Sequence, residues 1–321
     1  MIRRRMFIGA SAILFTYLTA VTGQAENVRR IAFFSTAAGP NYLADAFKLG
    51  LRDAGYVEGR NLTIEYRWMD GREKDYRNVA GELAELKVDA IVTAGHPAAL
   101  AAKNATSLIP IIALAVVDPV GSGLAESLSH PGGNVTGFSL ESSLQTNAKM
   151  IQLLNEAVAG VTRVGVLWNS ANPGSRVYLD AMRDAAEPLG VILKVYDVRR
   201  TEDIDLAFQA LEGSVDGLVV FPESLMWTQR SHIVDMARAA RLPTIYGWRA
   251  ATEIGGLMSY GPDLIDLFKR GAGYVDKVLK GAKPGDLPIQ QPTNFELVIN
   301  LKTARALGVD VPPTIAAEII E

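Results

Sequence analysis

An internal repeat constrains the fold of this chain more than any other feature of its sequence. Four pairs of segments match in order: 30–36 with 163–169, 62–67 with 191–196, 88–92 with 215–219, and 109–112 with 242–245. A period of roughly 130 residues is too long for a solenoid repeat. The repeat instead predicts two similar α/β lobes, with a cleft between them that can enclose a small molecule.

Strand and helix patterns alternate from Arg30 onward, which favours parallel sheets covered on both faces. Residues 31–34 are continuously apolar, as a buried parallel strand requires. The interpretation is an α/β fold of two Rossmann-like lobes with parallel sheets, and a chain that crosses a hinge three times. The expected boundaries are 28–139 plus 261–288 for the N-terminal lobe, and 140–260 plus 289–321 for the C-terminal lobe.

The first 25 residues have the pattern of a cleaved export signal. Three arginines at positions 3–5 precede an uncharged apolar run from Met6 to Val21, and Gly23-Gln24-Ala25 provides the small residues of a cleavage site. We therefore expect cleavage near Ala25 and a periplasmic protein. Both the Sec and the twin-arginine routes stay open, because residues 4–8 also resemble a twin-arginine signal. An uncleaved anchor fits less well, because Gly9, Ser11 and Thr16 interrupt the apolar run.

Charge and cysteine content exclude several classes of protein. Cleavage removes three of the 32 basic residues and none of the 35 acidic ones, which leaves a net charge of −6. A nucleic-acid partner is not expected, because binding to nucleic acid depends largely on neutralising phosphates. The chain has no cysteine, so disulfides, thiolate metal sites and lipidation at the cleavage point are excluded. No cofactor or metal is expected, and the protein is expected to be a monomer.

The candidate binding residues follow the ends of predicted strands, because ligands of parallel α/β sheets lie beyond the carboxyl ends of the strands. The first lobe is expected to present Ser35, Thr36, Gly95, His96 and Asp118, and the second Asn172, Ser175, Glu223 and Trp248, with Tyr260 near the hinge. Hydroxyl groups and helix N-termini can hold a carboxylate. Asp118 or Glu223 can pair with an ammonium group. The aromatic residues can pack on an apolar side chain. The residue types suit an amino acid or a similar small solute.

Each candidate also has a purely structural interpretation. Asp118 can cap a turn before Pro119, and His96 can be an ordinary loop residue. Residues 172–175 can form a turn with Ser175 as a helix cap. Trp248 and Tyr260 can pack within a lobe, and Glu223 can be solvated. Arg67 and Trp68, at the end of a strand, suggest either a carboxylate clamp or a salt-bridged rim.

Signatures of catalysis are largely missing from the sequence. The three histidines at 96, 130 and 232 lack the spacing of metal ligands. Neither first strand is followed by a phosphate-binding loop or a dinucleotide fingerprint. A Gly-x-Ser-x-Gly nucleophile elbow does not occur either, so residues 130–133 are interpreted as a turn and not as an oxyanion segment.

Several motifs resemble those of ABC-transporter substrate-binding proteins of the tryptophan/tyrosine-type family. They are GLRDAGYVEGRN at 50–61, DPVGSGL at 118–124, PGGNVTG at 131–137, GGLMSYG at 255–261 and QPTNFELVINLKTA at 291–304. The last is the most specific, and together the motifs span nearly all of the chain after the signal. The resemblance implies a type I periplasmic-binding fold with three hinge strands and an aromatic or other hydrophobic amino acid as ligand. In related sugar binders, the loop after the fourth strand and the third crossing both touch the ligand. The resemblance implies that Asp118 and Tyr260 lie at the matching places in this chain.

The resulting hypothesis is an extracytoplasmic solute-binding protein that traps its ligand by hinge closure and serves an ABC permease of the inner membrane. Two alternatives stay open. One is an enzyme that acts on a small molecule on the same α/β scaffold. The other is the sensing domain of a receptor or repressor, which would need a DNA-binding helix pair or a membrane tether, and the sequence provides neither.

Overall fold

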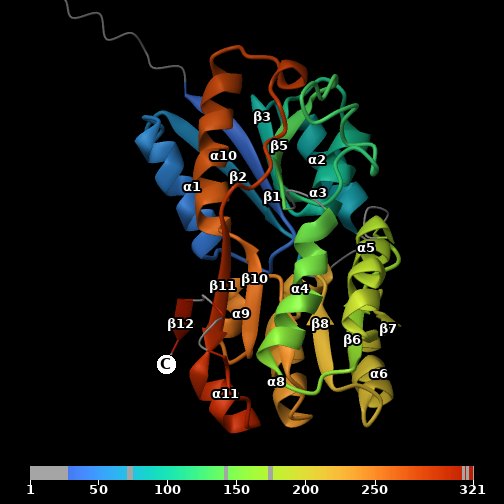
Figure 1. The fold of residues 1–321 in the computed structure, drawn as a ribbon. Coiled ribbons are helices and arrows are strands. Elements are labelled where there is room, and N and C mark those ends of the chain that lie inside the picture. The colour runs from blue at the N-terminus through green and yellow to red at the C-terminus, as the bar shows by residue number, and fades with distance from the viewer. Residues whose placement is uncertain are drawn as a thin grey trace, which may run out of the picture.

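The computed structural model describes residues 28–70, 75–140, 144–172, 176–312, 315 and 318–320. The predicted signal at residues 1–25 lies outside the described residues, and so does Ser175. Within the described ranges, no helix combines the length and the apolar character needed to cross a membrane. The chain forms two α/β lobes, which lie one above the other in Figure 1.

The first lobe is built on a parallel sheet whose described strands have the order β2-β1-β3-β4-β5. They are β1 (Arg29–Ser35), β2 (Leu62–Trp68), β3 (Ala90–Ala94), β4 (Ile111–Val116) and β5 (Val135–Ser139). Its helices are α1 (Tyr42–Asp53), α2 (Tyr76–Glu85), α3 (His96–Ala105) and α10 (Leu264–Leu279). Helix α10 returns from late in the chain and packs against α1 and β4.

The second lobe is built on a sheet whose described strands, starting from β7, have the order β7-β6-β8-β9-β10-β11-β12. The strands are β6 (Arg163–Trp168), β7 (Ile192–Asp197), β8 (Gly217–Val220), β9 (Thr244–Tyr246), β10 (Met258–Pro262), β11 (Phe295–Asn300) and β12 (Glu318–Ile320). The helices are α4 (Leu144–Ala157), α5 (Arg176–Ala186), α6 (Thr201–Leu211), α7 (Ser224–Thr228), α8 (Arg230–Ala239), α9 (Arg249–Glu253) and α11 (Leu301–Leu307). Short 3₁₀ turns lie at Glu187–Leu189 and Pro284–Asp286.

The predicted two-lobed α/β fold is confirmed, and the repeat in the sequence becomes a repeat in topology. The order β2-β1-β3-β4-β5 of the first sheet matches β7-β6-β8-β9-β10 of the second. Strands β10 and β11 are antiparallel, whereas the other described pairs are parallel. The strands at the centre of both sheets are buried, as the apolar runs indicated: all five residues of β3 and all four of β8 are buried.

The chain passes between the two sheets after β5, after β10 and before β11. The third passage lies beside the first sheet, because Ser139 N–H donates to the Gln290 carbonyl and Gln290 N–H donates to the Gly137 carbonyl, both at 2.9 Å. Gly137 has a φ of +141°, and a Cβ there would lie 1.9 Å from the Ala113 carbonyl oxygen. Glycine is therefore required where β4 and β5 approach each other, next to the first passage of the chain between the sheets.

Candidate functional site

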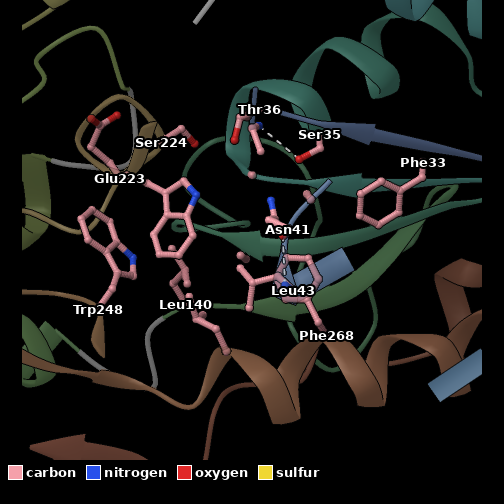
Figure 2. A pocket seen from close by; sticks show the side chains of 16 residues that line it. Phe33, Ser35, Thr36, Asn41, Leu43, Leu140, Glu223, Ser224, Trp248 and Phe268 are labelled. Atoms are coloured by element: carbon pink, nitrogen blue, oxygen red, sulfur yellow. Dashed lines mark hydrogen bonds between the residues drawn. The ribbon is translucent and has the colours of Figure 1, made fainter. Parts of the chain in front are cut away.

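Two neighbouring chambers lie between the lobes, beyond the carboxyl ends of strands from both sheets. The inner chamber has a volume of about 50 Å³ and is lined by Phe33, Ser35, Thr36, Ala37, Asn41, Leu43, Ala94, Gly95, Ala115, Leu140, Glu223, Ser224, Trp227, Trp248, Leu264 and Phe268 (Figure 2). The outer chamber has a volume of about 220 Å³ and is lined by Thr36, Tyr76, His96, Pro97, Leu100, Asn169, Ala171, Asn172, Glu223, Ser224, Leu225 and Thr228. Thr36, Glu223 and Ser224 line both.

The inner chamber has aromatic walls from both lobes. The indoles of Trp227 and Trp248 pack edge to face with centroids 5.5 Å apart, and both side chains are buried. Tyr42 of α1 reaches across from the first lobe to within 6.4 Å of the Trp227 ring centroid. Burial raises the pKa of Tyr42 to about 12, against the lowering effect of Arg230, so the phenol stays neutral. Such edge-to-face pairs favour packing against another flat ring.

Local hydrogen bonds fix the polar residues that the first lobe contributes. Ser35 Oγ accepts from Ala37 N–H at 3.2 Å, and Thr36 N–H donates to the Ala94 carbonyl at 3.1 Å. Asn41 Oδ1 accepts from the N–H groups of Leu43 and Ala44 and thereby caps α1. Ser35 and Asn41 thus hold the loop between β1 and α1 in shape at the chamber wall, as Figure 2 shows.

The lobes touch where the two chambers meet. Gly95 has a φ of +101°, and a Cβ there would lie 2.6 Å from Thr36 Cγ2 and 3.1 Å from the Oγ of Ser224 in the opposite lobe. The side chains of Thr36 and Ser224 lie near each other in Figure 2. A Cβ at position 95 would therefore clash with Thr36 within the first lobe and crowd Ser224 of the second, at a backbone conformation that favours glycine.

Glu223 is the one buried carboxylate among the residues that the structure describes, with 4% of its surface exposed. Its Oε1 accepts from Met226 N–H at 2.8 Å, which caps α7, and its Oε2 accepts from Asn169 Nδ2 at 3.4 Å. No lysine or arginine is buried within the described residues. A carboxylate can accept several hydrogen bonds at its two oxygens, so Glu223 can also accept from a donor group on a ligand in these chambers.

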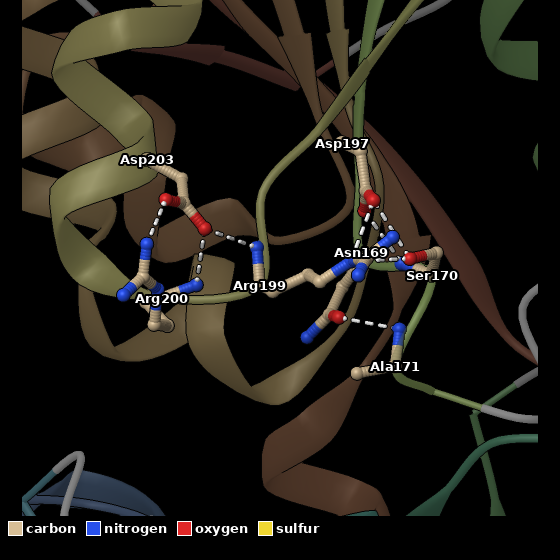
Figure 3. Close-up of polar contacts among 7 residues, drawn as sticks. All are labelled: Asn169, Ser170, Ala171, Asp197, Arg199, Arg200 and Asp203. Carbon is tan, nitrogen blue, oxygen red and sulfur yellow. Dashed lines mark hydrogen bonds and ion pairs between the residues drawn. The ribbon is translucent and has the colours of Figure 1, made fainter.

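The outer chamber brings together His96 and the loop that follows β6. His96 is the first residue of α3 and is 3% exposed, and burial lowers its pKa to about 4. On the other side, Asn169 Oδ1 accepts from Ala171 N–H at 2.9 Å. Asp197 accepts from the N–H and the hydroxyl of Ser170 and from Arg199 Nε (Figure 3). These bonds hold the loop that carries Asn172 against the chamber.

Partial burial acts to raise the pKa of Asp197, but the hydrogen bonds from Ser170 and Arg199 outweigh it, and the pKa is lowered. The carboxylate therefore stays charged at neutral pH and anchors the loop. Arg199 N–H and Arg200 N–H donate to Asp203 at the start of α6, as Figure 3 also shows. This network stabilises the loop and does not itself line either chamber.

The structure gathers most of the candidate residues at the chambers but not all. Ser35, Thr36, Gly95, Glu223 and Trp248 line the inner chamber, and Thr36, His96, Asn172 and Glu223 line the outer one. Glu223 is buried and caps a helix, so the alternative of a solvated strand-end acid does not hold. His96 is likewise a buried helix residue and not a loop residue.

Asp118 and Tyr260 line neither chamber. Asp118 has a φ of +37°, and its Oδ1 accepts from Gly121 N–H at 2.9 Å, so it forms a turn after β4. Tyr260 stacks on Phe295 with ring centroids 5.8 Å apart, which is packing between β10 and β11. Arg67 forms an ion pair with Glu65 at 4.0 Å, consistent with a rim position.

Several lining residues were not predicted from the sequence. Trp227 and Ser224 lie in α7, a five-residue helix whose length is too short for a periodic signal. Leu264 and Phe268 lie on the buried face of α10, and that face also reaches the chamber. Glu223 and Ser224, in the loop and helix start that follow β8, were the one signal that could have extended the prediction to Trp227. Within the described residues, no group of three acidic or histidine side chains could hold a metal ion.

Comparisons with known proteins agree with this architecture. A curated relative, the tyrosine-binding protein of Clostridioides difficile strain R20291, is 29% identical over 261 residues, which is 81% of this chain and 75% of the relative. A conserved domain protein from Vibrio cholerae has a TM-score of 0.84 at 27% identity and covers 91% of this chain and 100% of its own. A Streptococcus pneumonia ABC domain in complex with L-Trp has a TM-score of 0.81 at 27% identity, and the match covers 90% of this chain and 100% of that domain.

A third solved structure is the ligand-free, open form of a substrate-binding protein with adhesive properties from Clostridium difficile. It has a TM-score of 0.67 at 25% identity and covers 92% of this chain and 99% of its own. The family model described as ABC transporter substrate binding protein matches residues 33–321. The chain therefore belongs to the family of ABC transporter substrate-binding proteins.

Proposed function

We propose that this chain is an exported solute-binding protein that binds an aromatic or other hydrophobic amino acid between its lobes and delivers it to an ABC permease of the inner membrane. The lobes comprise residues 28–139 plus 261–288 and residues 140–260 plus 289–321, and the ligand closes them about the hinge. The signal is cleaved near Ala25, and the mature protein acts as a monomer in the periplasm.

The observation that best supports this proposal is the lining of the inner chamber. Its walls combine an aromatic pair, Trp227 and Trp248, with Phe33 and Phe268, and the buried carboxylate of Glu223 lies beside them. A hydrophobic amino acid offers a matching apolar side chain and an ammonium group. The relatives point the same way, because one is named for tyrosine and another holds L-Trp.

Lobe closure is supported by the origin of the chamber walls. Because they come from both lobes, a ligand gains its second set of contacts only when the lobes approach, and this difference in contacts drives the closed population. At similar identity, the chain superposes better on the L-Trp complex, with a TM-score of 0.81, than on the open relative, with 0.67. This difference favours a lobe arrangement nearer to that of the L-Trp complex. The inner chamber would widen as the lobes separate.

The expected affinity is in the micromolar range, which corresponds to about −8 kcal/mol. A buried ring contributes roughly 1.5–3 kcal/mol, and each charge-assisted hydrogen bond contributes roughly 1.5–3 kcal/mol. One ring and three such bonds together contribute roughly 6–12 kcal/mol before the cost of the lost ligand freedom.

A thermal-shift screen of the purified protein against the common amino acids and small carboxylates tests the proposal. Ligand at about 100 times its dissociation constant adds about 2.7 kcal/mol of stability, which predicts an increase of several degrees in Tm for L-Trp, L-Tyr or L-Phe. The ligand should be recovered chemically intact after long incubation, since an enzyme on this scaffold would convert it. If no hydrophobic amino acid raises the midpoint, the proposed ligand class is wrong.

A further inference from the structure

The outer chamber contains a buried histidine whose hydrogen-bonding atoms are not used by the protein. His96 is 3% exposed, and among the described residues neither its Nδ1 nor its Nε2 has a hydrogen-bond partner. Its side chain lines a chamber of about 220 Å³. An unsatisfied buried polar group costs stability, so natural structures rarely keep one without a use.

The backbone at His96 adds further donors. His96 and Pro97 begin the ten-residue helix α3, and its N-cap residue, Gly95, offers no side-chain cap. The first N–H groups of a helix have no acceptor within the helix and carry partial positive charge. In α3 these are the N–H groups of His96 and Ala98, because Pro97 has no N–H and Ala99 N–H donates to the Gly95 carbonyl at 3.3 Å. By contrast, Asn41 caps α1 and Glu223 caps α7 with their side chains. The start of α3 is therefore suited to an anionic oxygen, and the side chain of His96 lies at the same wall.

The wall that the second lobe contributes to the chamber has a carboxyl group. Glu223 lines it from the second lobe, together with Asn172 and Ser224. Because burial lowers its pKa to about 4, the His96 ring is neutral near pH 7 and holds one N–H donor and one acceptor nitrogen. A donor group on one side and a buried carboxylate on the other match the two charges of a zwitterion.

We propose that the outer chamber binds the α-amino acid head group: the His96 ring N–H and the first turn of α3 hold the α-carboxylate, and Glu223 holds the ammonium group. The side chain of the ligand is then directed toward the aromatic walls of the inner chamber, and to admit it the lobe contact near Gly95 and Ser224 and the chamber of about 50 Å³ have to widen. This assignment rests on the proposed function and makes His96 a specificity-determining residue. It excludes decarboxylated amines as good ligands, even when they carry the same ring.

Calorimetric titration with three probes tests the assignment: L-tryptophan, tryptamine, which lacks the carboxylate, and indole-3-propionate, which lacks the ammonium group. In the wild-type protein, L-tryptophan binds at least tenfold more tightly than either analogue. His96→Ala weakens L-tryptophan at least tenfold and leaves tryptamine unchanged. His96→Gln, which keeps an N–H donor, restores part of the loss. His232→Ala is the matched control, because His232 is exposed and should change neither affinity.

The outcomes distinguish failure of the head-group assignment from failure of the proposed function. If L-tryptophan binds and His96→Ala weakens tryptamine as much as it weakens L-tryptophan, or weakens neither, the head-group assignment is overturned while the proposed function stands. If the wild-type protein binds none of L-tryptophan, L-tyrosine and L-phenylalanine, the proposed function fails and the assignment falls with it. Circular dichroism of each variant checks that the fold is kept.

Discussion

Acidification should destabilise this protein through His96 in particular, and replacement of His96 by Gln should remove that sensitivity. In the folded chain the imidazole is buried, with no partner for either ring nitrogen among the described residues. Burial lowers its pKa from 6.5 to about 4, because a charged ring would lose its hydration. The unfolded chain has no such restriction and binds a proton at the ordinary pKa.

The sign and the size of the effect follow from this difference. Above pH 6.5 the ring is neutral in both states, and the free energy of unfolding does not depend on it. Between pH 6.5 and about 4 the unfolded state binds a proton that the folded state does not, so stability falls by about 1.4 kcal/mol per pH unit. The total loss is about 3 kcal/mol by pH 4, below which both states are protonated and the slope vanishes.

Denaturant unfolding of ligand-free protein, followed by circular dichroism at several pH values from 7.5 to 4, measures this loss. Carboxylates titrate in the same range, so the informative quantity is the difference between wild type and His96→Gln at each pH. That difference should change by about 3 kcal/mol in favour of the variant as the pH falls. His232→Gln controls for the loss of a surface histidine, because the His232 side chain is exposed. Its Nε2 lies 2.7 Å from Asp205 Oδ1. A flat difference for His96→Gln would refute the reasoning from burial.

Four further substitutions test other parts of the structure. Gly137→Ala places a Cβ 1.9 Å from a carbonyl oxygen at a φ of +141° and should lower the free energy of unfolding by about 3 kcal/mol or more, measured in denaturant. Gly133→Ala, which meets nothing within 4 Å, is its control and should change stability by less than about 0.5 kcal/mol. Asp118→Ala removes the bond to Gly121 N–H and should cost about 1 kcal/mol of stability without changing ligand affinity by calorimetry; weakened binding would return Asp118 to the site. Tyr42→Ala removes the ring contact with Trp227 and should weaken ligand binding roughly two- to tenfold, whereas an unchanged affinity would mean that this contact does not contribute to closure.

The order of elements could be predicted from the sequence because the repeat and the apolar runs are strong signals. Buried parallel strands such as β3 and β8 consist almost entirely of apolar residues, and the alternation with helical stripes is regular. The three-residue strand β12 and the five-residue helices α7 and α9 were not predicted, since elements this short lack periodicity. The antiparallel orientation of β11 depends on the path of the returning chain, which no local pattern encodes.

For the site, the rule that ligands lie beyond strand ends was sufficient for residues directly after β1 and β3 and in the loop after β8. Thr36, Gly95 and Glu223 all line a chamber. The same rule selected Asp118, but there the backbone turns through a positive φ, and the side chain bonds to its own loop. Whether a strand-end residue faces the cleft depends on turn geometry and on the opposite lobe. The local sequence around a strand end determines neither the turn geometry nor the position of the opposite lobe.

The edge-to-face pair of Trp227 and Trp248 equips the cleft with a built-in optical probe. The sequence contains four tryptophans, and these two form an indole pair between the lobes. A movement of one lobe against the other would change the surroundings of these chromophores, and Trp68 and Trp168, which line neither chamber, also contribute to the emission. Capture and release can thus be timed by stopped-flow fluorescence on unlabelled protein.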